Sequence, residues 1–238
     1  MRTAETNRLR KLLAAAGAPE GALHPIAQLV DLVASDPEHA PTSIVEPSAV
    51  LEQHVADALD GLAVPQVRDA HRLVDLGSGA GFPGLVLAAV LPAARVAVLD
   101  SATRKCAFLR RAAGAMGLDR VEVVHARIEE WQDAPPGPDV ITVRAVAPLN
   151  VLLEYAAPVL APGGHLVAWK GHRDAAEEAD AAAAAAATGL ESAGVLSVPA
   201  RASATDHHLH VYAKVAQTPE RFPRRPGVAR KRPVTAGA

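Results

Sequence analysis

Residues 73–84 read LVDLGSGAGFPG, an apolar run that enters a glycine-rich turn before a second apolar run begins. Glycine adopts positive φ readily and leaves room for a ligand beside the main chain. When such a turn follows the first strand of a doubly wound sheet, it lies at the carboxyl ends of the strands, where these folds bind nucleotides. The stretch therefore predicts an α/β fold that holds an adenosine-containing ligand on this turn.

From this turn onward, short β-branched runs alternate with helical runs. The expected strands are 73–76, 95–100, 121–126, 139–146, 165–170, 194–199 and 207–215. The expected helices are 83–91, 103–117, 149–159 and the alanine-rich 173–188. Because alternating strands and helices form parallel sheets with right-handed crossovers, we predict a Rossmann-like, doubly wound sheet of seven strands.

The two ends of the chain differ from this pattern. Before the sheet, apolar residues recur at helical spacing, and Pro47 suits the first turn of a helix. Residues 219–238 carry six basic side chains, one acid and four prolines, so we expect no helix or central strand there. The predicted division is an N-terminal helical extension packed on the core (1–70), a cofactor-binding domain (71–217) and a flexible basic tail (218–238).

The composition excludes several classes of protein. Half of the 238 residues are hydrophobic and 21% are charged, which excludes a wholly disordered chain. A net charge of −2 gives no general attraction to nucleic acid or to an anionic membrane, so any basic surface must be local. The single cysteine, Cys106, points to a reducing compartment. Glycines and prolines interrupt the uncharged run 76–94, and we expect a cytoplasmic protein without a membrane segment.

Two cofactors compete for the glycine-rich turn, a dinucleotide and S-adenosylmethionine. Asp75 before the turn would repel a pyrophosphate but suits the ammonium and sulfonium groups of S-adenosylmethionine. Counted from Gly77, the dinucleotide pattern G-x-G-x-x-G has Phe82 in place of its third glycine, but counted from Gly79 it is complete. Asp100 ends the second strand, where it could accept hydrogen bonds from the ribose of either cofactor or cap the next helix.

Five segments resemble the bacterial small-subunit rRNA guanine-N7 methyltransferases, the family also called glucose-inhibited division protein B. They are DLGSGAGFPG (75–84), DSATRKCAFL (100–109), HARIEE (125–130), DVITVRAVAPL (139–149) and PGGHLVAWKG (162–171). The likeness spans roughly residues 40–215. It implies the fold of class I S-adenosylmethionine-dependent methyltransferases, S-adenosylmethionine as cofactor, and N7 of a guanine in 16S rRNA of the small ribosomal subunit as target.

The resemblance also implies roles for single residues. Gly77 and Phe82 would contact the cofactor, Ile128 and Glu129 would hold its adenosine side, and Arg144 would lie where cofactor and guanine meet. With the residues argued above, the candidate cofactor-binding set is Asp75, Gly77, Gly79, Gly81, Phe82, Asp100, Ile128, Glu129 and Arg144. Guanine N7 has a lone pair and no proton, so the reaction needs positioning and charge rather than a general base.

Three residues are candidates for the catalytic, substrate-facing side. Arg144 ends the fourth strand and could bind a phosphate or the guanine O6 edge, and its alternative is a surface ion pair with Glu129 or Asp139. Arg127 follows the third strand and is either an RNA contact or a solvated arginine. His54 lies on the apolar face of a helix and is either a substrate residue or a core histidine.

Two departures from the family pattern keep other functions open. The family's Arg-His-x-x-x-Asp reads QHVAD at 53–57, and its aromatic and Asn-Leu-Thr segment appears only as APT at 40–42. Both departures fall on the side expected to face substrate. A small-molecule methyltransferase of the same fold and a non-catalytic ribosome-associated module therefore remain alternatives.

The expected partners are 16S rRNA or the precursor of the small subunit, bound by a monomer without metal or membrane. His208 and His210 share one face of the last strand and His207 the other, which is a poor arrangement for a metal. The basic tail is predicted to anchor RNA, because it is the one concentrated positive segment. Its alternatives are a solubilising tail or one that folds back on its own domain.

Overall fold

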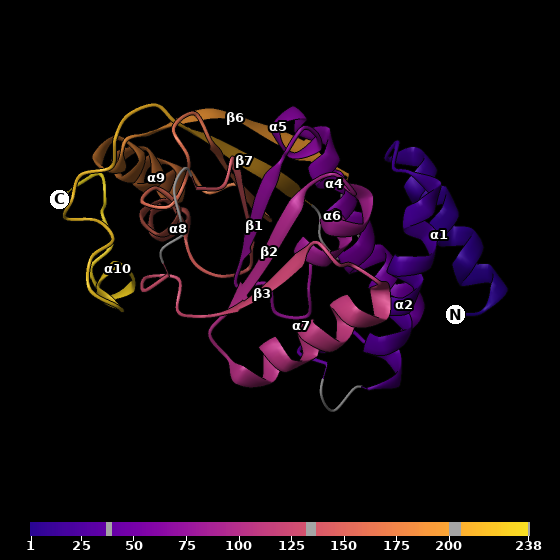
Figure 1. Cartoon of the computed structure of the whole chain (residues 1–238). Coiled ribbons are helices and arrows are strands. Elements are labelled where there is room, and N and C mark those ends of the chain that lie inside the picture. Colours follow the sequence, from indigo (N-terminus) through magenta and orange to yellow (C-terminus); the bar gives the residue numbers. More distant parts are fainter. Residues whose placement is uncertain (37–39, 132–136, 200–205, 238) are drawn as a thin grey trace.

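The computed structural model describes residues 1–36, 40–131, 137–199 and 206–237, and within them the chain forms a seven-stranded sheet with helices on both faces (Figure 1). The strand order is β3-β2-β1-β4-β5-β7-β6. The first five strands run parallel, and β7 runs antiparallel to both β5 and β6. The strands are β1 Arg72–Leu76, β2 Arg95–Asp100, β3 Val121–His125, β4 Val140–Arg144, β5 His165–Lys170, β6 Leu190–Val198 and β7 His207–Lys214. The predicted seven-stranded doubly wound sheet is confirmed.

The helices of the described residues precede, alternate with and follow these strands. Those before the sheet are α1 Thr3–Ala15, η1 Glu20–Ala22, α2 Leu23–Ser35, α3 Pro47–Val50, η2 Leu51–Val55, α4 Ala56–Asp60, η3 Gly61–Ala63 and α5 Pro65–Arg68. Those within and after the sheet are α6 Gly84–Val90, α7 Thr103–Met116, α8 Leu149–Ala156, α9 Ala175–Thr188 and α10 Val228–Lys231. Pro47 occupies the first turn of α3, as expected.

One predicted strand begins earlier than its sequence pattern suggested. The prediction started at residue 194, whereas β6 starts at Leu190, directly after Gly189 ends α9 in the left-handed conformation at φ 82°. Gly194 lies inside β6, at a register shift against β7 between Ser192 and Gly194. Glycine in a strand often marks such a bulge rather than the end of the strand.

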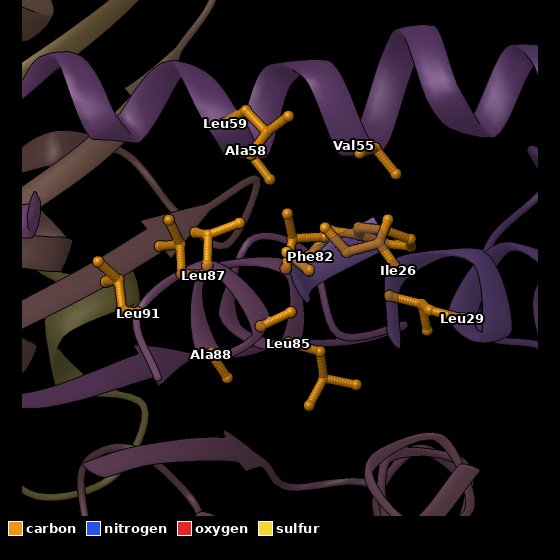
Figure 2. Packing of buried hydrophobic residues seen from close by; sticks show 14 of the residues in the cluster. Ile26, Leu29, Val55, Ala58, Leu59, Phe82, Leu85, Leu87, Ala88 and Leu91 are labelled. Carbon is orange, nitrogen blue, oxygen red and sulfur yellow. The ribbon is translucent and has the colours of Figure 1, made fainter. Parts of the chain in front are cut away.

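The N-terminal helices and α6 form the packing layer that supports the glycine-rich turn. Every residue of α6 is buried, which is typical of a helix enclosed on all sides. Figure 2 shows Ile26 and Leu29 of α2 on one side of Leu85 and Leu87, with η2 and α4 above them. Each such aliphatic side chain contributes about 1.5–3 kcal/mol when fully buried. The layer therefore holds the turn and the N-terminal helices in one core.

The C-terminal segment, residues 219–237, differs from the flexible, helix-free tail that the prolines predicted. It runs back against α8 and includes α10 (Figure 1). Phe222 is 7% exposed, and the Arg224 Nε donates to Glu154 Oε1 of α8 at 2.9 Å. Three of the four prolines, at 219, 223 and 226, precede Gly227. They therefore do not prevent α10, which begins after Gly227. The buried carboxylate of Glu154, on a helix 70 positions earlier in the chain, fixes the segment.

Candidate functional site

The glycine-rich turn follows β1, and its three glycines meet different demands. Gly77, Gly79 and Gly81 all have positive φ, at 71°, 60° and 91°. A Cβ on Gly77 would lie 2.5 Å from Val146 Cγ2, and one on Gly81 would lie 2.5 Å from Leu85 Cδ1. A Cβ on Gly79 would have only the Gly77 carbonyl oxygen nearby, at 3.9 Å. Packing therefore requires glycine at 77 and 81, whereas Gly79 is where the turn leaves open space for a ligand.

Asp75 braces this turn from the inside instead of facing a ligand. Its carboxylate accepts hydrogen bonds from Ser78 Oγ at 2.5 Å, Thr142 Oγ1 at 2.9 Å and the Gly84 backbone N–H at 3.1 Å. Asp75 is 1% exposed, and burial raises the pKa of its carboxyl although these hydrogen bonds oppose the rise. The direct cofactor contact expected for Asp75 is thus replaced by an internal one, and Asp75 lines neither of the two pockets beside the turn.

Those two pockets meet at the turn. The Arg144 pocket has a volume of about 580 Å³, and residues lining it include Thr42, Gln53, His54, Asp57, Phe82 and Arg144. The Asp100 pocket has a volume of about 410 Å³, and residues lining it include Asp100, Ser101, Arg127, Ile128, Glu129 and Tyr155. Both volumes fall in the range of small-molecule sites. Gly77, Lys105 and Ala145 line both pockets, so a single ligand can extend from one into the other.

Ala145, at the junction of the pockets, has a strained backbone. Its φ is 57°, a left-handed value that non-glycine residues seldom adopt. Such strained positions cluster at ligand sites, where the surrounding structure maintains them. The sharp turn at Ala145 directly follows Arg144 at the end of β4, so it separates the Arg144 side chain from the Asp100 pocket.

In the Asp100 pocket, the carboxylate of Asp100 serves the backbone and still faces the cavity. One oxygen accepts a hydrogen bond from the Ala102 N–H at 3.0 Å, and the other accepts one from the Gly79 N–H at 3.2 Å. Lys105 Nζ lies 3.5 Å from that second oxygen. The N-cap of α7 is Ala102, without a side-chain cap hydrogen bond, so Asp100 does not cap this helix as the alternative predicted, and it lines the pocket instead.

Glu129 is held on the opposite wall of the same pocket. Its Oε1 accepts hydrogen bonds from the Tyr155 hydroxyl at 3.3 Å and from the Gly227 N–H at 3.1 Å. Burial alone would raise the pKa of the Glu129 carboxyl, but hydrogen bonds from backbone N–H groups, including that of Gly227, outweigh burial and lower it. The structure thus brings Asp100, Ile128 and Glu129 together, and it places Arg127 with them instead of with Arg144.

The Arg144 pocket is organised around a buried ion pair. Arg144 Nη1 donates to Asp57 Oδ2 at 2.7 Å and to the Gln53 carbonyl oxygen at 3.3 Å. The Asp57 side chain is 3% exposed and that of Arg144 is 19% exposed. The surface ion pair predicted as the alternative is wrong, because Asp139 instead accepts the backbone N–H groups of residues 71 and 72, both at 2.8 Å.

Asp57 lines the Arg144 pocket, although the sequence pattern did not make it a candidate. Its second carboxylate oxygen lies 3.0 Å from His207 Nδ1, and its carbonyl oxygen accepts the indole N–H of Trp169 at 2.9 Å. It therefore joins α4 to β4, β5 and β7. Its place in the Gln53–Asp57 motif, four residues after Gln53 on one helical face, was the available signal. No local signal marks His207, which the sequence pattern places only on the opposite strand face from His208 and His210.

His54 lies in η2, a π-helical turn between α3 and α4, and such turns are frequent at functional sites. Arg144 Nη2 lies 3.1 Å from His54 Nδ1, and Thr42 Oγ1 lies 3.0 Å from Nε2. His54 Nδ1 also lies 3.2 Å from the carbonyl oxygen of Gln53, so a donor, Arg144, and an acceptor, Gln53, both lie beside this nitrogen. Burial, followed by the charge of Arg144, lowers the pKa of His54 from 6.5 to about 4. The imidazole is therefore neutral at physiological pH.

Phe82 connects the glycine-rich turn to the N-terminal helices. Its ring stacks on His54, with centroids 4.7 Å apart and an interplanar angle of 27°, and the Arg144 Cζ lies 5.9 Å from its centroid. The residue is 4% exposed, and Figure 2 shows it among Ile26 and Val55. Phe82 thus contributes to the wall of the Arg144 pocket mainly by fixing His54 and Arg144.

The lowered pKa of His54 predicts a pH-dependent stability. Between pH 6.5 and about 4 the unfolded chain binds a proton at this residue and the folded chain does not, so stability falls as the pH falls. We expect the His54 contribution to the free energy of unfolding to drop by about 2 kcal/mol from pH 7 to pH 5. Denaturant unfolding of the wild type and of His54→Gln at both pH values measures it.

His165 and His210 also have pKa values lowered by burial, so the wild type alone does not isolate His54. The quantity that decides is the difference in pH dependence between the wild type and His54→Gln. If both lose the same free energy between pH 7 and pH 5, His54 is not buried as a neutral imidazole.

Within the described ranges, no cluster of three or more His, Cys, Asp or Glu side chains is arranged to hold a metal ion. Of the helices in those ranges, none combines the length and apolarity that a bilayer crossing needs.

Comparison with known proteins identifies the family. The family model for GidB, described as rRNA small subunit methyltransferase G, matches residues 26–209. This chain belongs to the GidB family. The ribosomal RNA small subunit methyltransferase G of Rubrobacter xylanophilus is 41% identical over 198 residues, covering 81% of this chain and 76% of that protein. The protein of the same name from Pelotomaculum thermopropionicum is 36% identical over 196 residues, covering 81% of this chain and 82% of that protein.

Solved structures agree with this GidB-family fold. A SAM-dependent methyltransferase from Aquifex aeolicus matches with a TM-score of 0.56 at 20% identity, covering 71% of this chain and 94% of that one. An O-methyltransferase from Bacillus cereus in complex with SAH matches with a TM-score of 0.57 at 17% identity, covering 79% and 91%. The predicted class I methyltransferase fold is confirmed, and the resemblance carried by the sequence motifs is the correct family.

Proposed function

We propose that this GidB-family protein transfers a methyl group from S-adenosylmethionine to N7 of a guanine in 16S rRNA of the small ribosomal subunit. The observation that carries the proposal is the junction of the two pockets at Gly77, Lys105 and Ala145. The Asp100 pocket suits the adenosine of the cofactor, and the Arg144 pocket suits the guanine. When bound, S-adenosylmethionine supplies an electrophilic methyl group on its sulfonium.

The residues of the Asp100 pocket fit an adenosine group. Asp100 is 4% exposed and faces the cavity with a carboxylate that can accept ribose hydroxyls. Ile128 offers an apolar surface to the adenine, and Glu129 offers an acceptor beside it. Gly79, where a side chain is absent and the space is open, lets the remainder of the cofactor pass toward the Arg144 pocket.

The residues of the Arg144 pocket fit a reaction in which the protein positions the guanine and removes no proton. Among the described contacts, Arg144 directs three of its N–H groups toward other residues, two on Nη1 toward Asp57 and Gln53 and one on Nη2 toward His54. A guanidinium has five such donors in a rigid plane. The two that remain can orient guanine O6 or a neighbouring phosphate. His54, neutral at physiological pH, acts as a support for Arg144 and not as a base.

Asp57 has an electrostatic role in this proposal. Guanine becomes cationic as N7 takes the methyl group, and a bare guanidinium beside it would oppose the developing charge. The carboxylate of Asp57, 2.7 Å from Arg144, offsets that charge. Arg144 can therefore position the base at a lower electrostatic cost.

The substrate side of the Arg144 pocket carries both departures from the family pattern. Pro41, Thr42 and Gln53 all line this pocket, together with Lys105 and Lys170. Lys170 is paired with Glu177 at 2.6 Å and Lys105 lies 3.5 Å from Asp100, so both lysines are already beside a carboxylate. Because the departures lie here and not in the Asp100 pocket, they bear on the choice of target base and leave the cofactor side intact.

The proposal predicts binding of S-adenosylmethionine and not of NAD, and formation of 7-methylguanosine. Calorimetry with both ligands measures the first expectation. Transfer of labelled methyl to naked 16S rRNA, small subunits and small molecules in parallel, with mass analysis of the nucleosides, measures the second. Asp100→Ala should weaken the cofactor by about 1–3 kcal/mol, the cost of losing hydrogen bonds to a charged group.

Different outcomes favour the alternatives. Methyl transfer only to small molecules would identify a small-molecule methyltransferase, and cofactor binding without transfer to any substrate would identify a non-catalytic ribosome-associated module. A methylated nucleoside other than 7-methylguanosine would contradict the proposed target atom.

A further inference from the structure

The C-terminal segment 219–237 lies beyond residues 26–209, which the family model matches, yet it reaches the Asp100 pocket. Gly227 and Arg230 line this pocket together with Asp100, Ile128 and Glu129. The Gly227 N–H donates to Glu129 Oε1 at 3.1 Å. A segment outside the matched region therefore touches the carboxylate expected to bind the adenosine side of the cofactor.

Arg230 extends across the same wall. Its Nη2 donates to the carbonyl oxygen of Val146 at 3.0 Å, and Val146 itself lines the pocket beside the glycine-rich turn. The guanidinium thus bridges from the C-terminal segment to the loop after β4. A guanidinium so held presents a planar, weakly hydrated surface, which stacks readily on aromatic rings.

The segment is anchored by its own core contacts. Ala229 is 2% exposed and packs with Val151 and Tyr155 of α8, and Ile128 packs against this small cluster. Arg224 pairs with Glu154, which is 1% exposed. Because Ile128 touches both the anchored segment and the pocket, the segment is part of the structure that shapes the adenosine site.

We propose that the C-terminal segment 219–237 forms a wall of the S-adenosylmethionine pocket, in which Arg230 covers the adenosine and Gly227 fixes Glu129. This inference rests on the proposed function, since it assigns the Asp100 pocket to the adenosine. It differs from the prediction of a flexible RNA anchor, because the segment acts on cofactor affinity. Arg225 and Arg230 are both exposed, but only Arg230 lines the pocket.

Calorimetric titration of the full-length protein with S-adenosylhomocysteine tests this proposal. Arg230→Ala should weaken binding about fivefold, the loss expected for a cation–π contact near the protein surface. Arg225→Ala is the matched control, because it removes the same charge from the same segment at an exposed position that does not line the pocket. It should change the affinity by less than about twofold.

A second ligand locates the contact within the cofactor. Methylthioadenosine keeps the adenosine and lacks the amino-acid end. Arg230→Ala should weaken both ligands by the same factor. A loss confined to S-adenosylhomocysteine would overturn the assignment, because Arg230 would then serve the amino-acid carboxylate.

The remaining outcomes separate this proposal from the proposed function. If the wild type and Arg230→Ala bind S-adenosylhomocysteine equally well, the proposed contact of Arg230 with the adenosine is wrong. The proposed function is then unaffected. If the wild type binds neither ligand, the proposed function fails. Truncation after residue 218 should weaken binding further than Arg230→Ala, and circular dichroism of the truncated chain shows whether it is folded. If it is not, Arg230→Ala alone decides.

Discussion

Replacing Arg144 with alanine is expected to slow methyl transfer at least tenfold, which corresponds to about 1.4 kcal/mol of transition-state stabilisation. The guanidinium is the group that joins Asp57, Gln53 and His54 beside the pocket junction. Its removal also leaves the Asp57 carboxylate, 3% exposed, without the guanidinium and, among the described residues, with only the His207 side chain as an ion-pair partner. Breaking a buried pair from one side costs about 3 kcal/mol or more of folding stability, so turnover must be measured where the variant is folded.

Arg144→Lys should restore little activity, because an ammonium lacks the planar fork that reaches three acceptors at once. Asp57→Asn keeps the shape of the side chain and removes its charge. If Asp57 acts by positioning and neutralising Arg144, kcat should fall while the KM for S-adenosylmethionine stays near the wild-type value. A merely structural role would lower the fraction of folded enzyme and leave the kcat of that fraction unchanged.

Arg225→Ala serves as the control for these variants, since Arg225 is an exposed arginine that lines neither the Arg144 pocket nor the Asp100 pocket. Steady-state kinetics of methyl transfer to small subunits, with calorimetry of the cofactor, supply both readouts. Unchanged turnover in Arg144→Ala would remove this residue from the site. A change in cofactor affinity alone would reassign it to the cofactor.

The fold could be predicted from the sequence because its information is local. Most strands of the parallel part of the sheet contain a short apolar or β-branched run, and such patterns depend on near neighbours. Where the prediction was off, as at β6, the error was the interpretation of a single residue, Gly194, as the start of a strand instead of a bulge within it.

The site was less predictable because its decisive contacts are long-range. The sequence marked Arg144 and His54 separately, but Asp57, the ion-pair partner of Arg144, lies 87 positions from Arg144 and 150 from its other partner, His207. For Asp75 the charge argument was sound for an exposed carboxylate. Thr142, 67 positions away, consumes one of its oxygens, and no pattern near Asp75 shows this.

The structure of the basic C-terminal segment also depends on a long-range contact that its own sequence does not show. Charge and proline content describe how a segment behaves when nothing holds it, and they correctly identified an unusual stretch. They could not show that Glu154, in the middle of the apolar helix α8, needs a cation. A buried carboxylate in a helix that is otherwise apolar is a signal that something outside the helix must pair with it.

Arg224→Ala is accordingly expected to lower the free energy of unfolding by about 3–5 kcal/mol, because it leaves Glu154 buried and unpaired. Arg224 donates to both oxygens of this carboxylate through Nε and Nη2, and Glu154 is 1% exposed. Glu154→Gln in the Arg224→Ala background should recover much of the loss, since a neutral amide costs less to bury than a charge. Lys231→Ala, an exposed cation of the same segment, should change stability by less than about 0.5 kcal/mol. Denaturant unfolding of the four proteins measures these differences, and a loss below about 1 kcal/mol in Arg224→Ala would mean that this ion pair does not anchor the C-terminal segment.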